Sequence, residues 1–273
     1  MTFSIVARSE DGESWGIAVA SKFLGVGAVA PAAVAGVGAI STQAHANIAY
    51  KYEGLALLDD GATAQVALDR LLADDQGRDD RQVGIVDGEG SAVTWTGSRC
   101  YAWAGGVAGD GYAIQGNILT GPEVVEAMQS AWVASVGRPL ADRLVAALAA
   151  GDQAGGDSRG RQSAALLVVK DGAGYGGADD VAVDLRVDDH TDPVAELARL
   201  LELHDLYGTA SSPEEQVPLT DELRAETEAL ARAAGYADLR AWVAAENYEM
   251  RVAPGDRPEW IDARVLAILR GTP

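Results

Sequence analysis

Cysteine and histidine are scarce in this chain of 273 residues, and each scarcity argues against a class of site. The single cysteine, Cys100, rules out a disulfide within the chain, and its neighbours predict a small buried side chain in a strand. The three histidines, at positions 45, 190 and 204, share no metal-ligand spacing, so we expect no metal site. The glycine-rich loops match neither a P-loop nor a dinucleotide fingerprint, so we expect no cofactor.

Long hydrophobic runs and an excess of positive charge are missing too. The stretch from Val26 to Ile40 is apolar, but glycines and Pro31 interrupt it and it is too short to cross a bilayer. The chain does not open with a secretion signal, so we expect a cytoplasmic protein. Acidic residues number 41 against 21 basic ones, and the net charge of −20 argues against nucleic acid and membrane as partners. We expect a small-molecule partner, and the sequence is compatible with a homo-oligomer.

Short apolar runs separated by glycine and proline turns predict strands and helices that come in groups. We expect strands at 2–8, 15–21, 26–30, 37–42, 81–86, 91–96, 100–107, 112–119, 164–169 and 181–187, and helices at 48–58, 63–73, 121–134, 139–150 and 193–206. Such grouping favours antiparallel sheets over an alternating parallel fold. The predicted fold class is α+β: a four-layer αββα sandwich of two antiparallel sheets flanked by helices, with a small helical C-terminal module.

The composition changes at residues 208–218, which are rich in Ser, Pro and Glu and predict a linker. We therefore expect a main domain at 1–207 and a module at 219–273, with short helices at 219–234, 239–247 and 260–270. A module this small is marginal on its own, so we expect it to dock on the main domain. Its aromatic residues Trp242, Tyr248 and Trp260 either stack on sugar rings or form the core of the module.

The first residues of the chain combine a strand pattern with a nucleophile. The small residue Thr2 follows Met1, and a small second residue usually allows the cell to remove the initiator methionine. Thr2 would then carry a free α-amine, and a threonine whose own amine acts as general base is a complete nucleophile–base pair. The plain alternative is that Thr2 is only the first residue of a strand.

A hairpin turn at Asp11-Gly12 predicts what lies beside Thr2. A two-residue loop places Ser21 opposite Thr2, and a loop one residue longer places Lys22 there instead. Either register brings a polar side chain to the N-terminus that could tune its amine. The pleat places Thr2 and Ser4 on the same face of the strand.

Three further polar clusters could contribute to a site. They are Gln43 with His45 after a strand, Gln115-Gly116-Asn117 at a strand end, and Asp157, Arg159 and Gln162 in a glycine-rich loop. The second cluster could hold an oxyanion, and an arginine in the third could grip a substrate carboxylate. Each cluster also has a purely structural interpretation. His45 would be a surface histidine, Asn117 would support a turn, and Asp157 and Arg159 would form an ion pair that holds the loop.

Seven stretches in order resemble the Domain of Unknown Function 1028 family. They are MTFSIVAR at 1–8, SKFLGVG at 21–27, GVGAISTQAHAN at 36–47, RQVGIVDGEG at 81–90, IQGNILTGPEVVEAM at 114–128, GGDSRGRQSAALLVV at 155–169 and VDLRVDDHTDPVAEL at 183–197. The resemblance implies an N-terminal-nucleophile-hydrolase-like αββα fold for 1–207 and, by analogy, amide chemistry. The tail resembles the peptidoglycan-binding-like module of some members.

The leading hypothesis is an amidohydrolase that acts on a small amide or peptide-like metabolite. Thr2 would be the nucleophile, Lys22 or Ser21 would tune its amine, and Asn117 would hold the oxyanion. Substrate contacts would come from Ser4, Ser21, Gln43, His45, Asp157, Arg159 and Gln162. The alternative is a non-catalytic protein of the same fold that binds a small ligand or a cell-wall fragment.

Overall fold

The computed structural model describes residues 2–271, and its chain divides into two compact units. The N-terminal unit runs up to Leu201 and the C-terminal unit begins at Glu202. The division falls inside helix α6 (Pro193–Gly208), whose first residues pack on the N-terminal unit. Among the described residues no helix has the length and apolar character needed to cross a membrane.

Two antiparallel sheets form the centre of the N-terminal unit. The larger sheet has the order β10-β9-β2-β1-β8-β7, with β1 at Thr2–Arg8, β2 at Ser14–Ser21, β7 at Gly105–Gly109, β8 at Tyr112–Asn117, β9 at Ser163–Lys170 and β10 at Val181–Val187. The smaller has the order β3-β4-β5-β6, with β3 at Pro31–Val34, β4 at Gly38–Ala44, β5 at Arg81–Asp87 and β6 at Ala92–Thr96. Strand β1 therefore lies inside the larger sheet, with a neighbour on each side.

Alternation along β1 assigns its two faces. Phe3, Ile5 and Ala7 belong to the apolar cluster beneath the helices, whereas Val6 belongs to the cluster between the two sheets. The even-numbered positions of β1 thus face the smaller sheet, as the two-residue period of a strand requires. Thr2 and Ser4 share that inner face, where the side chains are polar rather than apolar.

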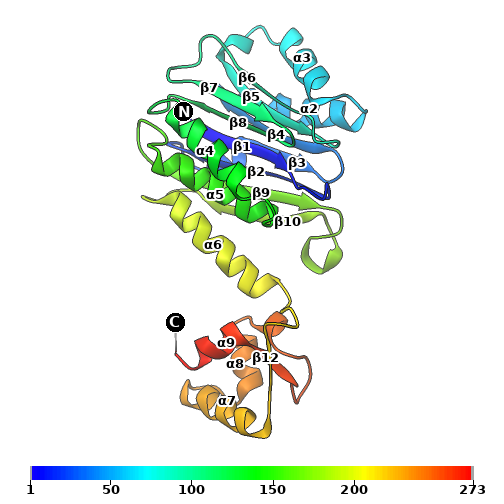
Figure 1. Ribbon diagram of the computed structural model, residues 1–273, viewed down its shortest axis with the longest axis vertical. Coiled ribbons are helices and arrows are strands. Elements are labelled where there is room, and N and C mark those ends of the chain that lie inside the picture. The colour runs from blue at the N-terminus through cyan, green and yellow to red at the C-terminus, as the bar shows by residue number, and fades with distance from the viewer. Residues whose placement is uncertain (1, 272–273) are drawn as a thin grey trace. The chain divides into compact units, whose positions relative to one another are not determined.

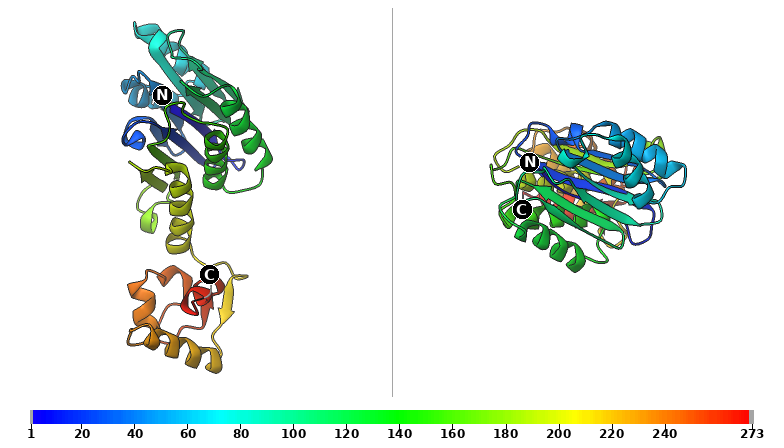
Figure 2. Two further views of the ribbon diagram at one scale, coloured as in Figure 1. Left: turned by 90° about the vertical axis from the view of Figure 1, so that its left-hand side faces the viewer. Right: turned by 90° about the horizontal axis from the view of Figure 1, so that it is seen from above.

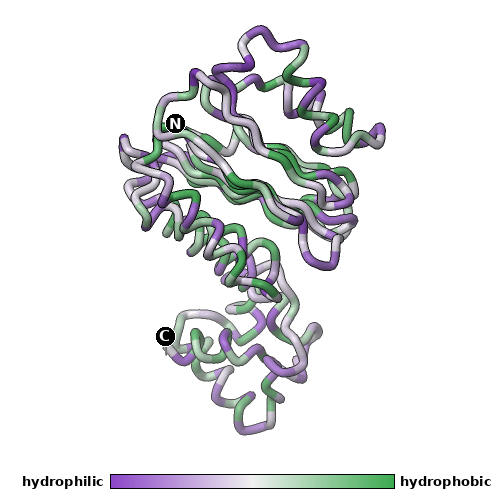
Figure 3. The backbone as a smooth tube through the Cα atoms, turned by 45° about the horizontal axis from the view of Figure 1, so that its top comes forward, coloured by the Kyte–Doolittle hydropathy of each residue, from purple (hydrophilic) through white to green (hydrophobic). Residues whose placement is uncertain are grey.

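Helices cover the outer faces of both sheets (Figures 1 and 2). On the larger sheet lie α4 (Glu123–Ala134), α5 (Leu140–Gln153) and the start of α6, and on the smaller lie α2 (Ala49–Asp59) and α3 (Ala64–Asp74). Figure 3 shows the hydrophobic stretches along the strands between these helices. The predicted four-layer αββα sandwich is confirmed.

One predicted strand in this unit is wrong, and the strand predicted at 100–107 begins only at Gly105. Residues Val26–Val29 form a short helix, α1, and the strand lies at Pro31–Val34. The run of valines and alanines suits either form, and Gly27 allows the helix to lie close to β9, because a Cβ there would come within 2.6 Å of the Ala165 side chain. Residues 100–104 are irregular rather than extended. Cys100 ends a turn that is closed by a hydrogen bond from its N–H to the Gly97 carbonyl.

The C-terminal unit combines helices with a two-stranded sheet. Its helices are α7 (Asp221–Ala233), α8 (Leu239–Ala245) and α9 (Ala263–Leu269), and β11 (Gln216–Pro218) pairs with β12 (Trp260–Asp262). The last residues of the linker predicted at 208–218 thus form β11, and the first residues of the helix predicted at 260–270 form β12. Trp242 and Tyr248 are buried and their rings lie 5.0 Å apart, so they form the core of this unit rather than a sugar-binding surface.

A buried ion pair ties the C-terminal unit together. Arg251 donates to the Asp262 carboxylate at 3.2 Å, and both side chains are almost fully buried. Asp262 also caps α9 by accepting the N–H groups of Arg264 and Val265. Burial raises the pKa of the Asp262 carboxyl, but hydrogen bonds from Ser211, the α9 N–H groups and Arg251 outweigh it, so that the pKa is lowered overall.

Candidate functional site

Thr2 stands at the start of β1 between two polar partners. The register pairs Phe3 with Ala20, which places Ser21 beside Thr2, as the two-residue hairpin loop predicts. On the other side, Thr2 pairs with Asn117 of β8. The hydroxyl oxygens of Thr2 and Ser21 lie 3.1 Å apart, a hydrogen-bond distance, and both side chains are buried.

A network of buried amides joins the two sheets beneath Thr2. Gln43 of the smaller sheet donates to the Thr2 carbonyl at 3.2 Å and to Gln82 Oε1 at 2.7 Å, and it accepts from the Ser4 hydroxyl at 2.7 Å. Asn117 Nδ2 also donates to Gln82 Oε1, at 2.8 Å, and to the Thr2 carbonyl at 3.5 Å. The carbonyl of Thr2 is therefore held by amides from both sheets.

Gln82 is the centre of this network, and sequence analysis missed it. Its side chain is fully buried, its Oε1 accepts from two amides, and its Nε2 donates to the Gly116 carbonyl at 2.7 Å and the Thr96 hydroxyl at 2.8 Å. The available signal was a glutamine next to a continuous apolar run in RQVGIVD. An unpaired buried amide is costly, so such a glutamine implies partners across the core.

Asp157 connects the glycine-rich loop to the end of β2. Its side chain is 3% exposed, and its Oδ2 accepts the backbone N–H of Lys22 at 2.7 Å. Its Oδ1 accepts the N–H of Arg159 at 2.9 Å, and the Arg159 guanidinium lies 3.5 Å from Oδ2. The carboxylate thus fixes the loop next to Ser21 and leaves the outer part of Arg159 exposed.

A pocket of about 200 Å³ opens beside the Thr2–Asn117 strand pair. The residues that line it come from five segments: Ala44, His45, Asp80, Arg99, Cys100, Tyr101, Asn117, Ile118 and Arg159. Of the two arginines in this lining, Arg99 is paired with Asp79 and Asp80, whereas the Arg159 guanidinium lies 3.5 Å from the Asp157 carboxylate and its side chain is 47% exposed. Arg159 is therefore the side chain of this pocket that is suited to contact a carboxylate or another anionic group of a ligand.

The His45 loop is held in place by an ion pair behind it. Arg81 donates to the His45 carbonyl at 2.6 Å and to the Asp75 carboxylate at 2.9 Å. Asp75 also accepts from the Tyr50 hydroxyl at 2.9 Å. The Arg81 hydrogen bond, with those from Gly77, Tyr50 and Asn47, holds the pKa of Asp75 well below its usual value, and burial raises the pKa of Tyr50.

Cys100 lines the pocket but is held as a neutral thiol. Its Sγ donates to the Arg81 carbonyl at 3.3 Å. Burial raises the pKa of the thiol, which disfavours the nucleophilic thiolate.

The structure brings together most of the residues singled out in the sequence. Thr2, Ser4, Ser21, Gln43 and Asn117 form one buried cluster. Arg159 and His45 line the adjacent pocket, with Asp157 behind Arg159. Ser4 is fully buried, so it supports the network rather than a surface contact.

Two of the expected residues are directed elsewhere. Lys22 Nζ donates to the carbonyl of Arg161 at 3.1 Å, and only the backbone N–H of Lys22 contacts Asp157. Gln162 donates to Asp189 at 3.1 Å. The expected removal of Met1 concerns a residue outside those that the structure describes.

Comparison with known proteins gives a family without an established function. Residues 2–197 match the family of unknown function DUF1028. A protein of the same family from Silicibacter pomeroyi, known from a crystal structure, shares 31% sequence identity with this chain. The alignment covers 75% of this chain and 89% of that chain, with a TM-score of 0.68. No curated protein matches the sequence.

Weaker likenesses involve a second group of solved structures. Anbu, an ancestral β-subunit, from Yersinia bercovieri is 9% identical over 77% of this chain and 98% of that chain, with a TM-score of 0.34. Anbu from Hyphomicrobium sp. strain MC1 is 11% identical over 77% of this chain and 98% of that chain, with a TM-score of 0.33. These scores are too low to support an argument about this protein.

Proposed function

The chain belongs to the DUF1028 family, and from this premise we propose that it is an amidohydrolase whose nucleophile is Thr2, exposed by removal of Met1. The observation that carries the proposal is the setting of Thr2. It is the first residue of a central strand, its hydroxyl lies 3.1 Å from that of Ser21, and the strand paired with it ends at a pocket of about 200 Å³. A small amide or peptide-like metabolite fits a pocket of this size.

The chemistry is carried by two groups of one residue. The α-amine of Thr2 takes the proton of its own hydroxyl as Oγ1 attacks the amide carbonyl, and the protonated amine then gives that proton to the departing nitrogen. The C–N bond breaks and an ester forms on Oγ1. Water, deprotonated by the same amine, then attacks the ester, and Thr2 is regenerated. Ser21 orients the Thr2 hydroxyl through their hydrogen bond.

Asn117 is proposed as a positioning residue rather than as the oxyanion donor. Its amide nitrogen already donates to Gln82 and to the Thr2 carbonyl, and its side chain is 1% exposed. With Gln43 it fixes the backbone of Thr2, so the nucleophile meets the substrate without reorganisation. We place Lys22 in a similar supporting role, because its N–H and its ammonium group hold the loop that carries Asp157 and Arg161.

Substrate orientation is proposed to come from the pocket wall. The Arg159 guanidinium would bind a substrate carboxylate, with His45 opposite, because both line the same pocket. The preferred substrate is therefore an amide that also carries an anionic group, such as an N-acyl amino acid.

The proposal is tested in two steps that need no knowledge of the natural substrate. Mass spectrometry of the intact protein is expected to show a chain that starts at Thr2; retained Met1 would remove the α-amine from Thr2 and overturn the mechanism. An acylating probe such as a β-lactone is then expected to label the N-terminal peptide of the wild type and of Thr2→Ser.

Matched variants complete the test. Thr2→Ala should give no labelled N-terminal peptide, whereas Thr191→Ala, which alters an exposed threonine, should label like the wild type. A library of N-acyl amino acids then identifies a substrate, on which Thr2→Ala should lose turnover. Unchanged turnover would rule out Thr2 as nucleophile, and a properly processed protein that neither labels nor turns over any amide would favour the non-catalytic binding protein.

A further inference from the structure

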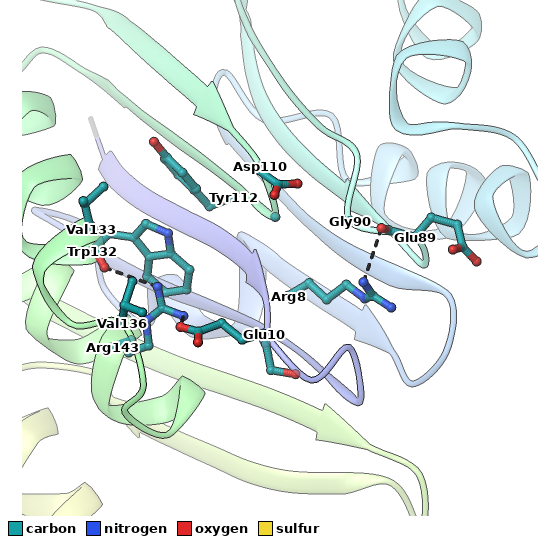
Figure 4. A pocket seen from close by; sticks show the side chains of 12 residues that line it. Arg8, Glu10, Glu89, Gly90, Asp110, Tyr112, Trp132, Val133, Val136 and Arg143 are labelled. Carbon is teal, nitrogen blue, oxygen red and sulfur yellow. Dashed lines mark hydrogen bonds and ion pairs between the residues drawn. The ribbon is translucent and has the colours of Figure 1, made fainter.

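A second pocket of about 360 Å³ lies at the opposite end of β1 from Thr2. It is lined by Arg8, Ser9, Glu10, Glu89, Gly90, Asp110, Gly111, Tyr112, Trp132, Val133, Val136 and Arg143 (Figure 4). Because Thr2 begins the strand and Arg8 ends it, this pocket belongs to a different edge of the sandwich from the Thr2 site. A pocket of this size is at the lower end of the range for small-molecule sites.

The frame of the pocket is rigid because three hairpin turns are tied together. The Arg8 N–H donates to the Gly111 carbonyl at 2.8 Å, and the Gly111 N–H donates to the Gly90 carbonyl at 3.0 Å. These bonds connect the end of β1 to the turn between β7 and β8 and to the turn between β5 and β6. The charged side chains on these turns therefore have a fixed backbone beneath them.

One wall of the pocket is apolar and comes from the end of helix α4. Trp132 is packed against Tyr112, with ring centroids 5.8 Å apart, and both are buried. Val133 and Val136, in contrast, are 57% and 64% exposed. Two valines that face solvent beside a cavity offer an apolar surface for a ligand side chain.

Arg143 holds this wall but has little capacity left for a ligand. Its guanidinium lies 3.7 Å from the Trp132 ring centroid and donates to Glu10 at 2.8 Å and to the Trp132 carbonyl at 3.3 Å. Glu10 Oε1 also accepts the N–H of Gly137 at 3.1 Å. Arg143 is thus a buried structural residue, and it binds one oxygen of the half-exposed Glu10 carboxylate.

Arg8, across the pocket, is less fully engaged. Its guanidinium carbon lies 5.6 Å from the Trp15 ring centroid, its Nη1 makes one long hydrogen bond, of 3.3 Å, to the Glu89 carbonyl, and its Nε is buried with no acceptor among the described residues. Figure 4 shows Arg8 on one side of the pocket and Arg143 with Trp132 on the other, with Glu10 between them. The Arg8 guanidinium can therefore accommodate a carboxylate at its outer edge.

Charge balance in the pocket selects the ligand class. The lining contains the acidic residues Glu10, Glu89 and Asp110 as well as the arginines Arg8 and Arg143, of which Arg143 already pairs with Glu10. A ligand that carries both charges satisfies both sets. Apolar side chains of the ligand would contact Val133 and Val136.

We propose that this pocket binds a small zwitterion, an α-amino acid with a large apolar side chain. Its carboxylate contacts Arg8, its ammonium group lies between Asp110 and the outer oxygen of Glu10, and its side chain packs on the α4 wall. The site does not depend on the proposed hydrolysis, because it shares no lining residue with the pocket of about 200 Å³ beside the Thr2–Asn117 strand pair.

Calorimetric titration of the full chain with L-phenylalanine tests the proposal, with phenethylamine and 3-phenylpropanoate as matched probes that each lack one charge. L-Phenylalanine is expected to bind, and each matched probe should bind roughly tenfold or more weakly, because each lacks one charge-assisted contact. Equal binding of phenethylamine, equal binding of 3-phenylpropanoate, or no binding of L-phenylalanine at millimolar concentration would each overturn the proposal.

Variants locate the binding in this pocket. Arg8→Gln and Asp110→Asn should each weaken L-phenylalanine binding about tenfold or more. Asp60→Asn is the same substitution at an exposed aspartate that does not line the pocket, so binding should be unchanged. Asp110 is exposed, so its variant should fold normally. Unaltered binding in Asp110→Asn, or equal loss in Asp60→Asn, would contradict the assignment.

Discussion

Asn117 Nδ2 donates to Gln82 Oε1 at 2.8 Å, and this hydrogen bond crosses from one sheet of the sandwich to the other. Both side chains are at most 1% exposed. Through it, the strand beside Thr2 is joined to the smaller sheet at the point where the candidate site lies. A buried amide that loses its hydrogen-bond partner costs free energy, so this link contributes to the stability of the sandwich.

The first prediction concerns this link. Gln82→Met keeps the approximate volume but removes the acceptor that the Asn117 and Gln43 amides share, and it removes the amide that donates to the Gly116 carbonyl. We expect the free energy of unfolding to fall by about 2–4 kcal/mol, measured by urea denaturation. As a control, Gln65→Ala removes an exposed glutamine that bonds Asp69, and it should change stability by less than about 0.5 kcal/mol. Equal losses would show that the network does not depend on Gln82.

A second prediction concerns Gly84, whose lack of a side chain leaves the space that the Gln115 side chain occupies. A Cβ at Gly84 would come within 2.2 Å of Gln115 Oε1, and Gln115 is fully buried and bonded to Ser4 at 2.7 Å, so it cannot swing away. Gly84→Ala should destabilise the protein by about 1–3 kcal/mol in thermal or urea unfolding. Gly208→Ala is the matched control, because its nearest neighbour is 4.0 Å away. A neutral Gly84→Ala would mean that the two sheets can move apart there.

The third prediction is a pH dependence that arises from Asp75. Hydrogen bonds, first from Arg81, depress the folded-state pKa of Asp75 below its usual value of 3.8. The contribution of ionised Asp75 to the free energy of unfolding is therefore fully present above about pH 4. It is lost as the pH falls below that value, because Asp75 takes up its proton in the unfolded chain at a higher pH than in the folded protein.

Asp75→Asn should remove this contribution. Its stability should be lower than that of the wild type at pH 7, by about 2 kcal/mol, and the difference should shrink between pH 4 and pH 2. Urea midpoints measured across this range provide the comparison. Asp79→Asn changes an exposed aspartate nearby, and it should follow the wild-type pH profile. A constant difference between Asp75→Asn and wild type would exclude the proposed linkage.

A fourth prediction separates the C-terminal unit from the rest of the chain. Asp262→Asn preserves the shape of the residue but removes the buried counter-charge of Arg251, which keeps the more exposed carboxylates of Asp205 and Glu215, so this unit should lose about 1–3 kcal/mol of stability. Hydrogen exchange followed by mass spectrometry should show faster exchange in peptides from 219–270 and unchanged exchange in β1 and β8. Asp256→Asn, at an exposed ion pair with Arg240, is the control and should exchange like the wild type. Uniformly faster exchange across the chain would contradict this expectation.

Local patterns were sufficient for much of the fold. The Asp11-Gly12 turn predicted the register that places Ser21 beside Thr2, and the grouping of strands and helices predicted two antiparallel sheets. These features depend on turn chemistry and on periods of two and 3.6 residues, which are properties of neighbouring residues. The same reasoning failed at 26–30, because valine and alanine runs suit either form; the segment is helical and lies close to Ala165, a residue distant in the sequence.

The amino-acid sequence by itself determined the candidate nucleophile, the strand that carries it, the hairpin partner Ser21 and the excess negative charge. Only the tertiary structure decided that Gln82 joins the Thr2 cluster, that Lys22 contacts Arg161 instead, and that Trp242 is a core residue. It alone also brought Arg8, Glu10 and Asp110 together around a second pocket. The physical reason is the range of the interactions: hydrogen bonds and packing between sheets join residues distant in sequence, and no local pattern records which of them meet.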